Sequence, residues 1–245
     1  MKQWIIWTLL AILTVGATSV SAQDVVETAI PERVELTAGD DLVLVGDVYS
    51  PADSAEGGAP AILLMHQNKS NRDMWEPLIP ALLEAGMVVL TVDLRAHGET
   101  GGRVDWTLAQ EDTQLWIAYL LAREGVNPEK VAVMGASIGS NLALVGCAAN
   151  EGCLTVVALS PGLDYFGVKP EISVSEGLRR RSALLVASRG DNTSAVAVRQ
   201  MAGSSKGLLG MRVYAGVAHA AEFFEDDLES VTGLIVSWLT DAFAD

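Results

Sequence analysis

The sequence predicts an α/β fold with a doubly wound, mostly parallel sheet that follows an N-terminal antiparallel hairpin. Short apolar runs of strand length recur along the chain, and helix-compatible segments separate them. Small polar residues and glycines follow directly after most of these runs. The chain has 245 residues, of which 50% are hydrophobic, enough for one sizeable core. We therefore expect one domain over residues 23–245.

Each element is indicated by a local pattern. Residues 33–38 and 42–49 alternate in polarity and are joined by Gly39-Asp40-Asp41, which predicts the hairpin. Apolar runs predict further strands at residues 61–65, 88–92, 131–134, 154–159, 182–187 and 211–214. Helices are expected at residues 74–85, 108–123, 141–149, 193–202 and 222–244. This alternation predicts a sheet with helices on both faces.

A serine stands where the strand at 131–134 turns into the following helix. The stretch Gly135-Ala-Ser-Ile-Gly139 places Ser137 at the apex of this turn. A serine on so sharp a turn is strained, and small neighbours are needed because larger side chains would collide with the adjacent strand or helix. Ligands of such sheets bind beyond the carboxyl ends of the strands. Ser137 is therefore a candidate nucleophile.

A serine nucleophile needs a general base, usually a histidine that a carboxylate orients. His219 lies in the loop between the last strand and the last helix and is the best placed of three histidines. Asp191 follows the strand at 182–187 after a short turn and is the preferred acid. Asp164, which follows the preceding strand, is the alternative, and either aspartate could instead form a turn or cap a helix.

The strand–turn–helix around Ser137 and the order serine, aspartate, histidine resemble the α/β-hydrolase family over nearly the whole mature chain. The stretch Asp-Leu-Arg-Ala-His-Gly at residues 93–98 is similar to a loop common in that family. The resemblance implies that Arg95 and His97 support the floor of the site. It also implies an oxyanion hole formed by the N–H groups of Ile138 and Gln67, although many members have glycine where Gln67 stands.

The chain is similar to the small serine esterases and dienelactone-hydrolase-like members of this family, with a minimal cap. Residues 161–181, between the two strands where larger caps usually enter, number only about twenty. Dienelactone hydrolases use a cysteine nucleophile, so a serine favours ordinary ester hydrolysis. Five aromatic and apolar residues are expected to line the pocket, although each could equally pack in the core or at the rim: Trp75, Trp106, Leu163, Tyr165 and Phe166.

The first residues are typical of a secretory signal peptide over residues 1–22. One lysine precedes an apolar run of about 12 residues, shorter than the roughly 20 that span a membrane, and small residues follow at the cleavage positions. We expect an exported protein without stable membrane insertion after cleavage, and the alternative is an uncleaved N-terminal anchor. In an oxidising compartment Cys147 and Cys153 could form a disulfide, or both could be buried thiols.

The sequence predicts a serine hydrolase that cleaves small carboxylic esters through an acyl-enzyme. Peptidase, thioesterase and acyltransferase activities use the same three residues and remain alternatives, as does a non-catalytic binding module of the same fold. The net charge of −15 argues against nucleic acid as a partner. No cofactor or metal is expected, because the three histidines lack the spacing of metal ligands. Nothing in the sequence indicates the oligomeric state or the particular ester.

Overall fold

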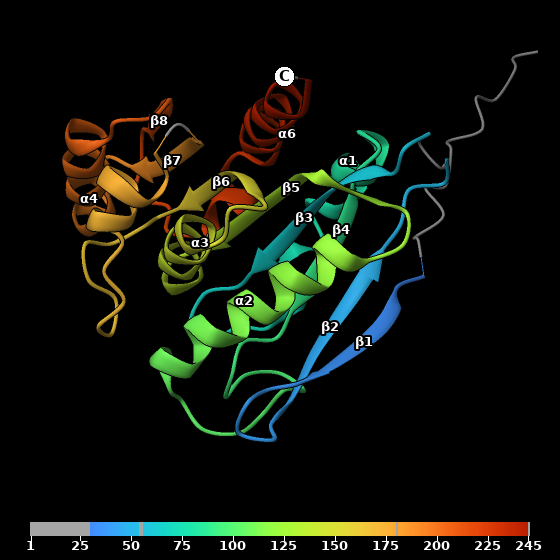
Figure 1. Ribbon diagram of the computed structural model, residues 1–245. Helices are drawn as coiled ribbons and strands as arrows, with labels where there is room; N and C mark the ends of the chain where they lie inside the picture. Colours follow the sequence, from blue (N-terminus) through green and yellow to red (C-terminus); the bar gives the residue numbers. More distant parts are fainter. Residues whose placement is uncertain (1–29, 54–55, 180, 245) are drawn as a thin grey trace, which may run out of the picture.

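The computed structural model describes residues 30–53, 56–179 and 181–244. The predicted signal peptide, residues 1–22, lies outside the described residues. Eight strands form one sheet in the order β1-β2-β4-β3-β5-β6-β7-β8 (Figure 1). Within the described ranges no helix is long and apolar enough to cross a membrane. The α/β class with an N-terminal hairpin is confirmed.

The hairpin forms one edge of the sheet. β1 (Glu32–Thr37) pairs antiparallel with β2 (Val43–Tyr49), and β2 in turn pairs antiparallel with β4 (Val88–Val92). Asp41 has a φ of 64° in the connecting turn, a conformation that aspartate tolerates better than most residues. The turn residues predicted from the sequence therefore match the backbone that the hairpin needs.

The remaining pairings, from β4 through β3 to β8, are parallel. Alternate residues of β3 enter two separate hydrophobic cores, with Leu63 and Met65 on one face and Ile62 and Leu64 on the other. A strand buried on both faces must be apolar throughout, which is why these runs were recognisable. The other strands are β3 (Ala59–Met65), β5 (Val126–Ala136), β6 (Cys153–Leu159), β7 (Ser182–Ser188) and β8 (Leu209–Tyr214).

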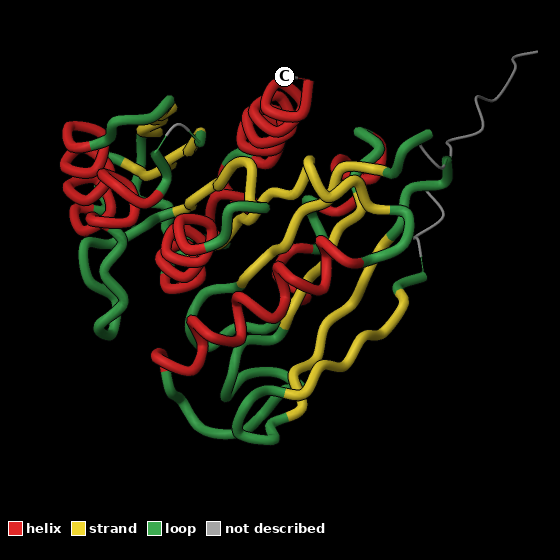
Figure 2. The backbone as a smooth tube through the Cα atoms, viewed as in Figure 1, coloured by secondary structure: helices red, strands yellow, loops and turns green. Residues whose placement is uncertain are grey.

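Helices cover both faces of the sheet, as Figure 2 shows in red and yellow. One face is covered by α2 (Trp106–Ala122), α3 (Ile138–Ala149) and α4 (Asn192–Ser204). The other face is covered by α1 (Ile79–Glu84), α5 (Glu222–Asp226) and α6 (Leu228–Ala244). The crossovers bring the ends of β5, β7 and β8 to one edge, where the loops that follow them meet.

The continuous helix predicted over residues 74–85 is wrong. A 3₁₀ turn, η1 (Arg72–Trp75), comes first, and α1 begins only at Ile79. Pro77 and Pro80 explain the break, since proline has no N–H to donate and its ring clashes with the preceding helical turn. Pro80 is accommodated because it lies in the first turn of α1, where N–H groups have no helical acceptor.

The single helix predicted over residues 222–244 is also wrong. It divides into α5 and α6 at Asp227, whose backbone φ is −157°. Acidic residues lie on both sides of the break, with Glu225 and Asp226 at the end of α5 and Glu229 in the first turn of α6. Only the position in α6 is favourable, because negative charge stabilises a helix N-terminus. Apolar spacing alone does not predict this break.

Candidate active site

Ser137 occupies the sharp turn between β5 and α3. Its φ of 53° and ψ of −119° lie outside the regions that non-glycine residues favour, at a cost of about 1–3 kcal/mol. Its N–H donates to the carbonyl of Leu159 at 2.9 Å, which ties the turn to the neighbouring strand β6. The turn therefore presents the serine hydroxyl at the carboxyl edge of the sheet.

Two glycines make this turn sterically feasible. A Cβ on Gly135 would lie 2.0 Å from the carbonyl oxygen of Gly139. A Cβ on Gly139 would lie 2.3 Å from the carbonyl oxygen of Met65, the last residue of β3. Because the obstructing atoms belong to the backbone, they cannot move aside without distorting the sheet. The close approach of strand and helix accounts for the glycines at both positions.

His219 lies beside Ser137 at the start of the segment that leads into α5. Its Nε2 is 2.9 Å from Ser137 Oγ, and its Nδ1 is 2.7 Å from Asp191 Oδ2. An Nδ1 that faces a carboxylate carries the proton, which leaves Nε2 to accept the serine hydroxyl. Two hydrogen bonds fix the backbone of this loop, because the Glu222 carboxylate accepts the His219 N–H and Ser160 Oγ accepts the Ala220 N–H.

Asp191 has two contacts that use different carboxylate oxygens. Oδ2 accepts from His219, while Oδ1 accepts the N–H of Ser194 at 3.3 Å and so caps α4. Burial acts to raise the pKa of Asp191, but hydrogen bonds from Ser194 and His219 outweigh it and lower the pKa below its ordinary value. The carboxylate is consequently charged at neutral pH and able to orient the imidazole.

The structure does not bring the alternative acid, Asp164, to His219. Asp164 Oδ1 accepts the N–H of Gly167 at 2.7 Å, and its other oxygen pairs with Lys169 at 3.4 Å. Its side chain is 49% exposed. Asp164 therefore stabilises a surface turn, the structural role that short acidic side chains commonly have.

The two predicted oxyanion donors differ in their surroundings. Ile138 is the first residue of α3, where N–H groups have no acceptor within the helix. The Gln67 N–H instead donates to Met74 Sδ at 3.4 Å, and the Gln67 side-chain oxygen accepts the N–H of Ala221. Among the described residues Asn68 N–H makes no hydrogen bond to the protein, so it is a second candidate. The thioether contact of Gln67 had no signal in the sequence.

His66 and His97 lie under the site and use both ring nitrogens for internal bonds. His66 Nε2 accepts the N–H of Leu94, and burial lowers the pKa of His66 to about 4. His97 contacts the carbonyl of Arg95 and the side chain of Asn68 at 2.9 and 3.1 Å. Neither ring forms a hydrogen bond with Ser137, so both histidines have structural roles.

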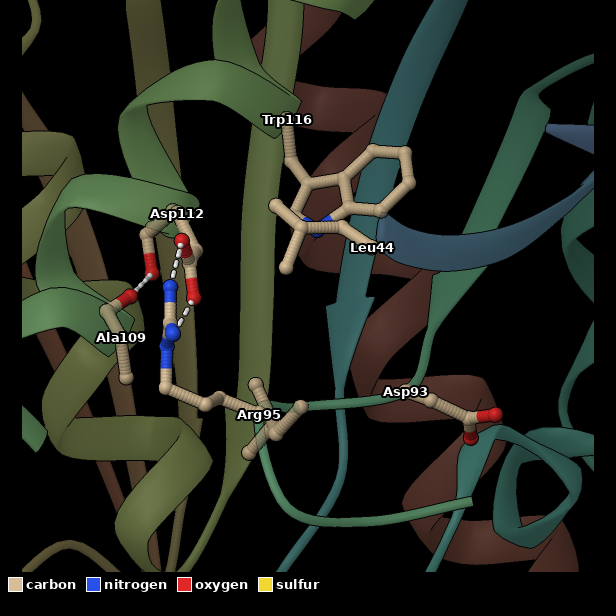
Figure 3. A pocket seen from close by; sticks show the side chains of 8 residues that line it. Leu44, Asp93, Arg95, Ala109, Asp112 and Trp116 are labelled. Carbon is tan, nitrogen blue, oxygen red and sulfur yellow. Dashed lines mark hydrogen bonds and ion pairs between the residues drawn. The ribbon is translucent and has the colours of Figure 1, made fainter. Parts of the chain in front are cut away.

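Arg95 is held by two carboxylates. Its guanidinium forms a fork with Asp112 at 2.8 and 2.9 Å (Figure 3). It also pairs with Asp40 in the hairpin turn. These bonds raise the pKa of Arg95 further, so it is permanently charged. A void of about 10 Å³ lies beneath it, and a wider hollow of about 500 Å³ lies beside the hairpin turn. Neither is lined by Ser137, Asp191 or His219.

A second buried ion-pair cluster next to the site was not anticipated. Arg72 binds Asp47 of β2 at 2.5 Å, Glu99 at 2.6 Å and the buried carboxylate of Asp93. Asp93 also accepts the backbone N–H groups of Arg72 and Glu99. The cluster fixes the two loops that follow β3 and β4. A lone arginine in a polar loop offers no periodic signal, so nothing in the sequence indicated this role.

The predicted pocket residues divide into core and surface. Trp75 is fully buried and packs edge-on against Phe224, so it belongs to the core. Its place in η1 turns the ring into the core instead of toward the site. Leu163 packs partly against the core. Trp106 and Phe166 stack on each other at the surface, with ring centroids 5.4 Å apart.

Tyr165 contacts the site directly. Its ring lies edge-on to His219 with centroids 6.5 Å apart, and its hydroxyl donates to the carbonyl of Ser160. Burial raises the pKa of Tyr165, and a hydrogen bond that its oxygen accepts from the Ser194 hydroxyl opposes that rise. The phenol therefore stays neutral and packs against the imidazole.

Cys147 and Cys153 form a disulfide with Cα atoms 5.2 Å apart. It joins the last turn of α3 to the start of β6. Arg181 donates to the carbonyls of Cys147 and Asn150 at 2.5 Å, so the exposed end of α3 is further fixed. The disulfide is far along α3 from Ser137 and has a structural role.

A serine on a strand–turn–helix, within reach of a histidine that an aspartate holds, on a doubly wound sheet, defines the class of α/β hydrolases. The esterase Pf2001 of Pyrococcus furiosus has a similar structure, with a TM-score of 0.71 and 17% identity over 88% of this chain and 94% of that one. The carboxylesterase EstE1 from a metagenomic library gives 0.70 and 19% over 88% and 90%. These likenesses concern the fold.

The sequence profile described as alpha/beta hydrolase fold matches residues 60–202, more than half of the chain. The chain therefore belongs to the alpha/beta hydrolase fold family. The uncharacterized protein YfhR of Escherichia coli O157:H7 is 30% identical over 149 residues, which cover 60% of this chain and 52% of the relative. The chain spans about half the length of the curated relatives it matches.

Proposed function

We propose that the protein is a serine hydrolase that cleaves carboxylic esters through an acyl-enzyme. The observation that carries this proposal is the continuous set of contacts from Ser137 Oγ to His219 and on to Asp191, at 2.9 and 2.7 Å. Membership of the alpha/beta hydrolase fold family supports hydrolysis as the reaction class. A purely structural role of the three residues would not require this sequence of contacts.

The first half of the reaction acylates the enzyme. Ser137 Oγ attacks the ester carbonyl while its proton passes to His219 Nε2, and Asp191 stabilises the imidazolium that forms. The negative charge on the carbonyl oxygen is held by backbone N–H groups, one from Ile138 and one from Asn68 or Gln67. When the tetrahedral intermediate collapses, the alcohol leaves with the proton from His219, and the acyl group remains on Ser137.

The second half regenerates the enzyme. A water molecule gives a proton to His219 Nε2 as its oxygen attacks the acyl carbonyl, and the resulting intermediate expels Ser137 Oγ, which takes the proton back. The carboxylic acid is then released. If Gln67 is the donor, its N–H must give up the contact with Met74 Sδ before it holds the oxyanion. The Asn68 N–H requires no such exchange.

We further propose that the protein is exported. The apolar N-terminal segment with small residues at its end supports this, and the disulfide between Cys147 and Cys153 suits an oxidising compartment. The N-terminal sequence of the protein isolated from its producing cells tests the proposal. A mature chain that begins near Gln23 is expected, whereas an intact Met1 would point to an uncleaved anchor.

Replacement of Ser137 by alanine tests the proposed reaction. We expect kcat toward p-nitrophenyl acetate to fall by about 10⁴-fold or more while the circular dichroism spectrum is unchanged. Full turnover by a folded Ser137→Ala protein would contradict the assignment.

Parallel assays of a peptide amide, an acyl thioester and acyl transfer to an added alcohol separate the enzyme classes that share this triad. We expect esters to be hydrolysed with the highest kcat/KM. A wild-type protein that turns over none of these substrates and does not react with a fluorophosphonate would be a binding module.

A further inference from the structure

Phe166 stands in a backbone position that is unfavourable for a phenylalanine. Tyr165 and Val168 exchange both backbone hydrogen bonds, at 3.2 and 2.9 Å, around a two-residue turn. The central residues Phe166 and Gly167 have φ values of 54° and 91°. Turns with two positive φ values favour Asn, Asp or Gly at the first central position, because a bulky side chain is strained there.

The side chain of Phe166 is also poorly placed for stability. It is 60% exposed to solvent, although a phenylalanine stabilises a protein mainly when it is buried. Its only aromatic partner among the described residues is Trp106, which it stacks on with an interplanar angle of 17°. Figure 1 shows the connection between β6 and β7 beside the N-terminal end of α2, where Trp106 lies. We call Trp106 and Phe166 the aromatic pair.

The aromatic pair borders the candidate active site and is held there rigidly. Asn141, fully buried one turn after Ser137 in α3, donates to the carbonyls of Gly162 and Val168 at 3.0 and 2.8 Å. Tyr165, next to Phe166, packs against His219. On the other side Trp106 lies 6.1 Å from the ring of His97. Both rings, of which Phe166 is exposed and Trp106 partly buried, are thus fixed relative to the serine.

We propose that the aromatic pair binds the apolar part, alkyl or aryl, of the ester substrate. The strained φ of Phe166 and the exposure of its apolar ring both destabilise the folded protein. A residue that costs stability in this way is explained if its ring contacts the substrate beside the triad. An apolar surface recognises an alkyl or aryl group through burial of its area from water. This inference rests on the proposed ester hydrolysis and adds the class of ester that is preferred.

The test compares substrate selectivity in four proteins: wild type, Phe166→Asn, Phe166→Leu and Leu208→Asn. Asparagine suits the positive φ, so the first variant removes the ring without straining the turn. Leucine keeps an apolar surface. Leu208 is the matched control, because it is 69% exposed and lies far from the site. Its carbonyl accepts the N–H of Ala183 at the start of β7, at the amino ends of the parallel strands, whereas the site lies at their carboxyl ends.

The measured quantity is the ratio of kcat/KM for a long or bulky ester to kcat/KM for p-nitrophenyl acetate. One series extends the acyl chain from acetate to decanoate, and the other extends the alcohol of aryl and alkyl acetates. We expect Phe166→Asn to lower this ratio about tenfold in at least one series, which identifies the side of the ester that is bound. Phe166→Leu should keep most of the ratio, and Leu208→Asn should keep all of it.

Thermal unfolding separates substrate binding from a structural role of the stacked rings. We expect the Tm of Phe166→Asn to be no lower than that of wild type, because strain in the turn is relieved. If an active Phe166→Asn protein has an unchanged kcat/KM ratio in both series, this inference is overturned but the proposed ester hydrolysis is not. If the Tm of that protein is also lower than that of wild type, the aromatic pair only fixes the loop. A wild type inactive toward every ester would overturn the proposed function as well.

Discussion

Asp191 illustrates how one side chain serves both the fold and the proposed reaction. One carboxylate oxygen caps α4 through Ser194, and the other orients His219. Aspartates that follow strands commonly cap helices, and here the capping geometry itself aims the second oxygen at the imidazole. The sequence favoured Asp191 but left Asp164 as the alternative, since both follow strands by a few residues.

The two aspartates make a matched pair of variants. We expect Asp191→Asn to lower kcat for p-nitrophenyl acetate by about 10⁴-fold, because an amide next to Nδ1 favours the wrong histidine tautomer. Asp164→Asn retains an acceptor for the Gly167 N–H, and its kcat should stay within about threefold of wild type. Steady-state kinetics of both proteins check the pair. The reverse pattern would make Asp164 the functional acid.

His66 should make stability depend on pH. Burial lowers the pKa of His66 to about 4 from an unfolded value of 6.5. Between these values the unfolded chain binds a proton that the folded chain does not, so stability falls as the pH falls. We expect this one group to remove about 3 kcal/mol of unfolding free energy between pH 6.5 and pH 4.

Urea unfolding at several pH values measures this effect in wild type and in His66→Gln. The glutamine oxygen can still accept the Leu94 N–H but does not titrate in this range. The variant should therefore lose less stability on acidification than wild type, while the carboxylates act equally in both. Parallel pH profiles for the two proteins would mean that His66 does not contribute.

At the scale of secondary structure, the sequence predicted the strands better than the helix ends. Strands such as β3 are buried on both faces and must be apolar throughout, so their positions could be predicted from the sequence. The break before α1 depends on prolines, and apolar spacing predicts neither that break nor the one before α6. The contacts of Asn141 with Val168 and of Ala221 with Gln67 join segments far apart in the chain, so a local sequence pattern cannot predict them.

The disulfide gives a prediction at the same scale. It closes a loop with a sequence separation of 6 residues, which restricts the unfolded chain by about 2 kcal/mol in the loop-entropy account. We expect the double variant Cys147→Ala and Cys153→Ala to lose about this much stability in urea unfolding. Dithiothreitol should lower the Tm of wild type and leave that of the double variant unchanged. Equal responses of both proteins would argue that the thiols are unpaired.

At the scale of the whole molecule, the Arg72 cluster joins the antiparallel and parallel parts of the sheet. It connects Asp47 of β2, Asp93 after β4 and the η1 segment after β3. Asp93 is almost inaccessible to solvent, so its carboxylate needs these partners in place of water. The sequence predicted the hairpin and the parallel sheet separately, but the buried ion pairs that connect them emerge only from the folded structure.

Removal of Arg72 should therefore destabilise the protein more than removal of an exposed arginine. We expect Arg72→Met to lose about 3–5 kcal/mol of unfolding free energy, because the carboxylate of Asp93 stays buried without its counter-ion. Arg33→Met, whose side chain is 46% exposed, should cause little change. Urea unfolding compares the two. A similar small loss in both variants would show that Asp93 needs no cationic partner.

The proposed reaction depends on Ser137 being a nucleophile that His219 activates. The most direct measurement is peptide mapping by mass spectrometry after reaction with a fluorophosphonate, in wild type and in His219→Ala. We expect one adduct per chain, located on Ser137, and none on the same time scale in the variant. A wild-type protein that stays unmodified, or an adduct on another residue, would contradict the account.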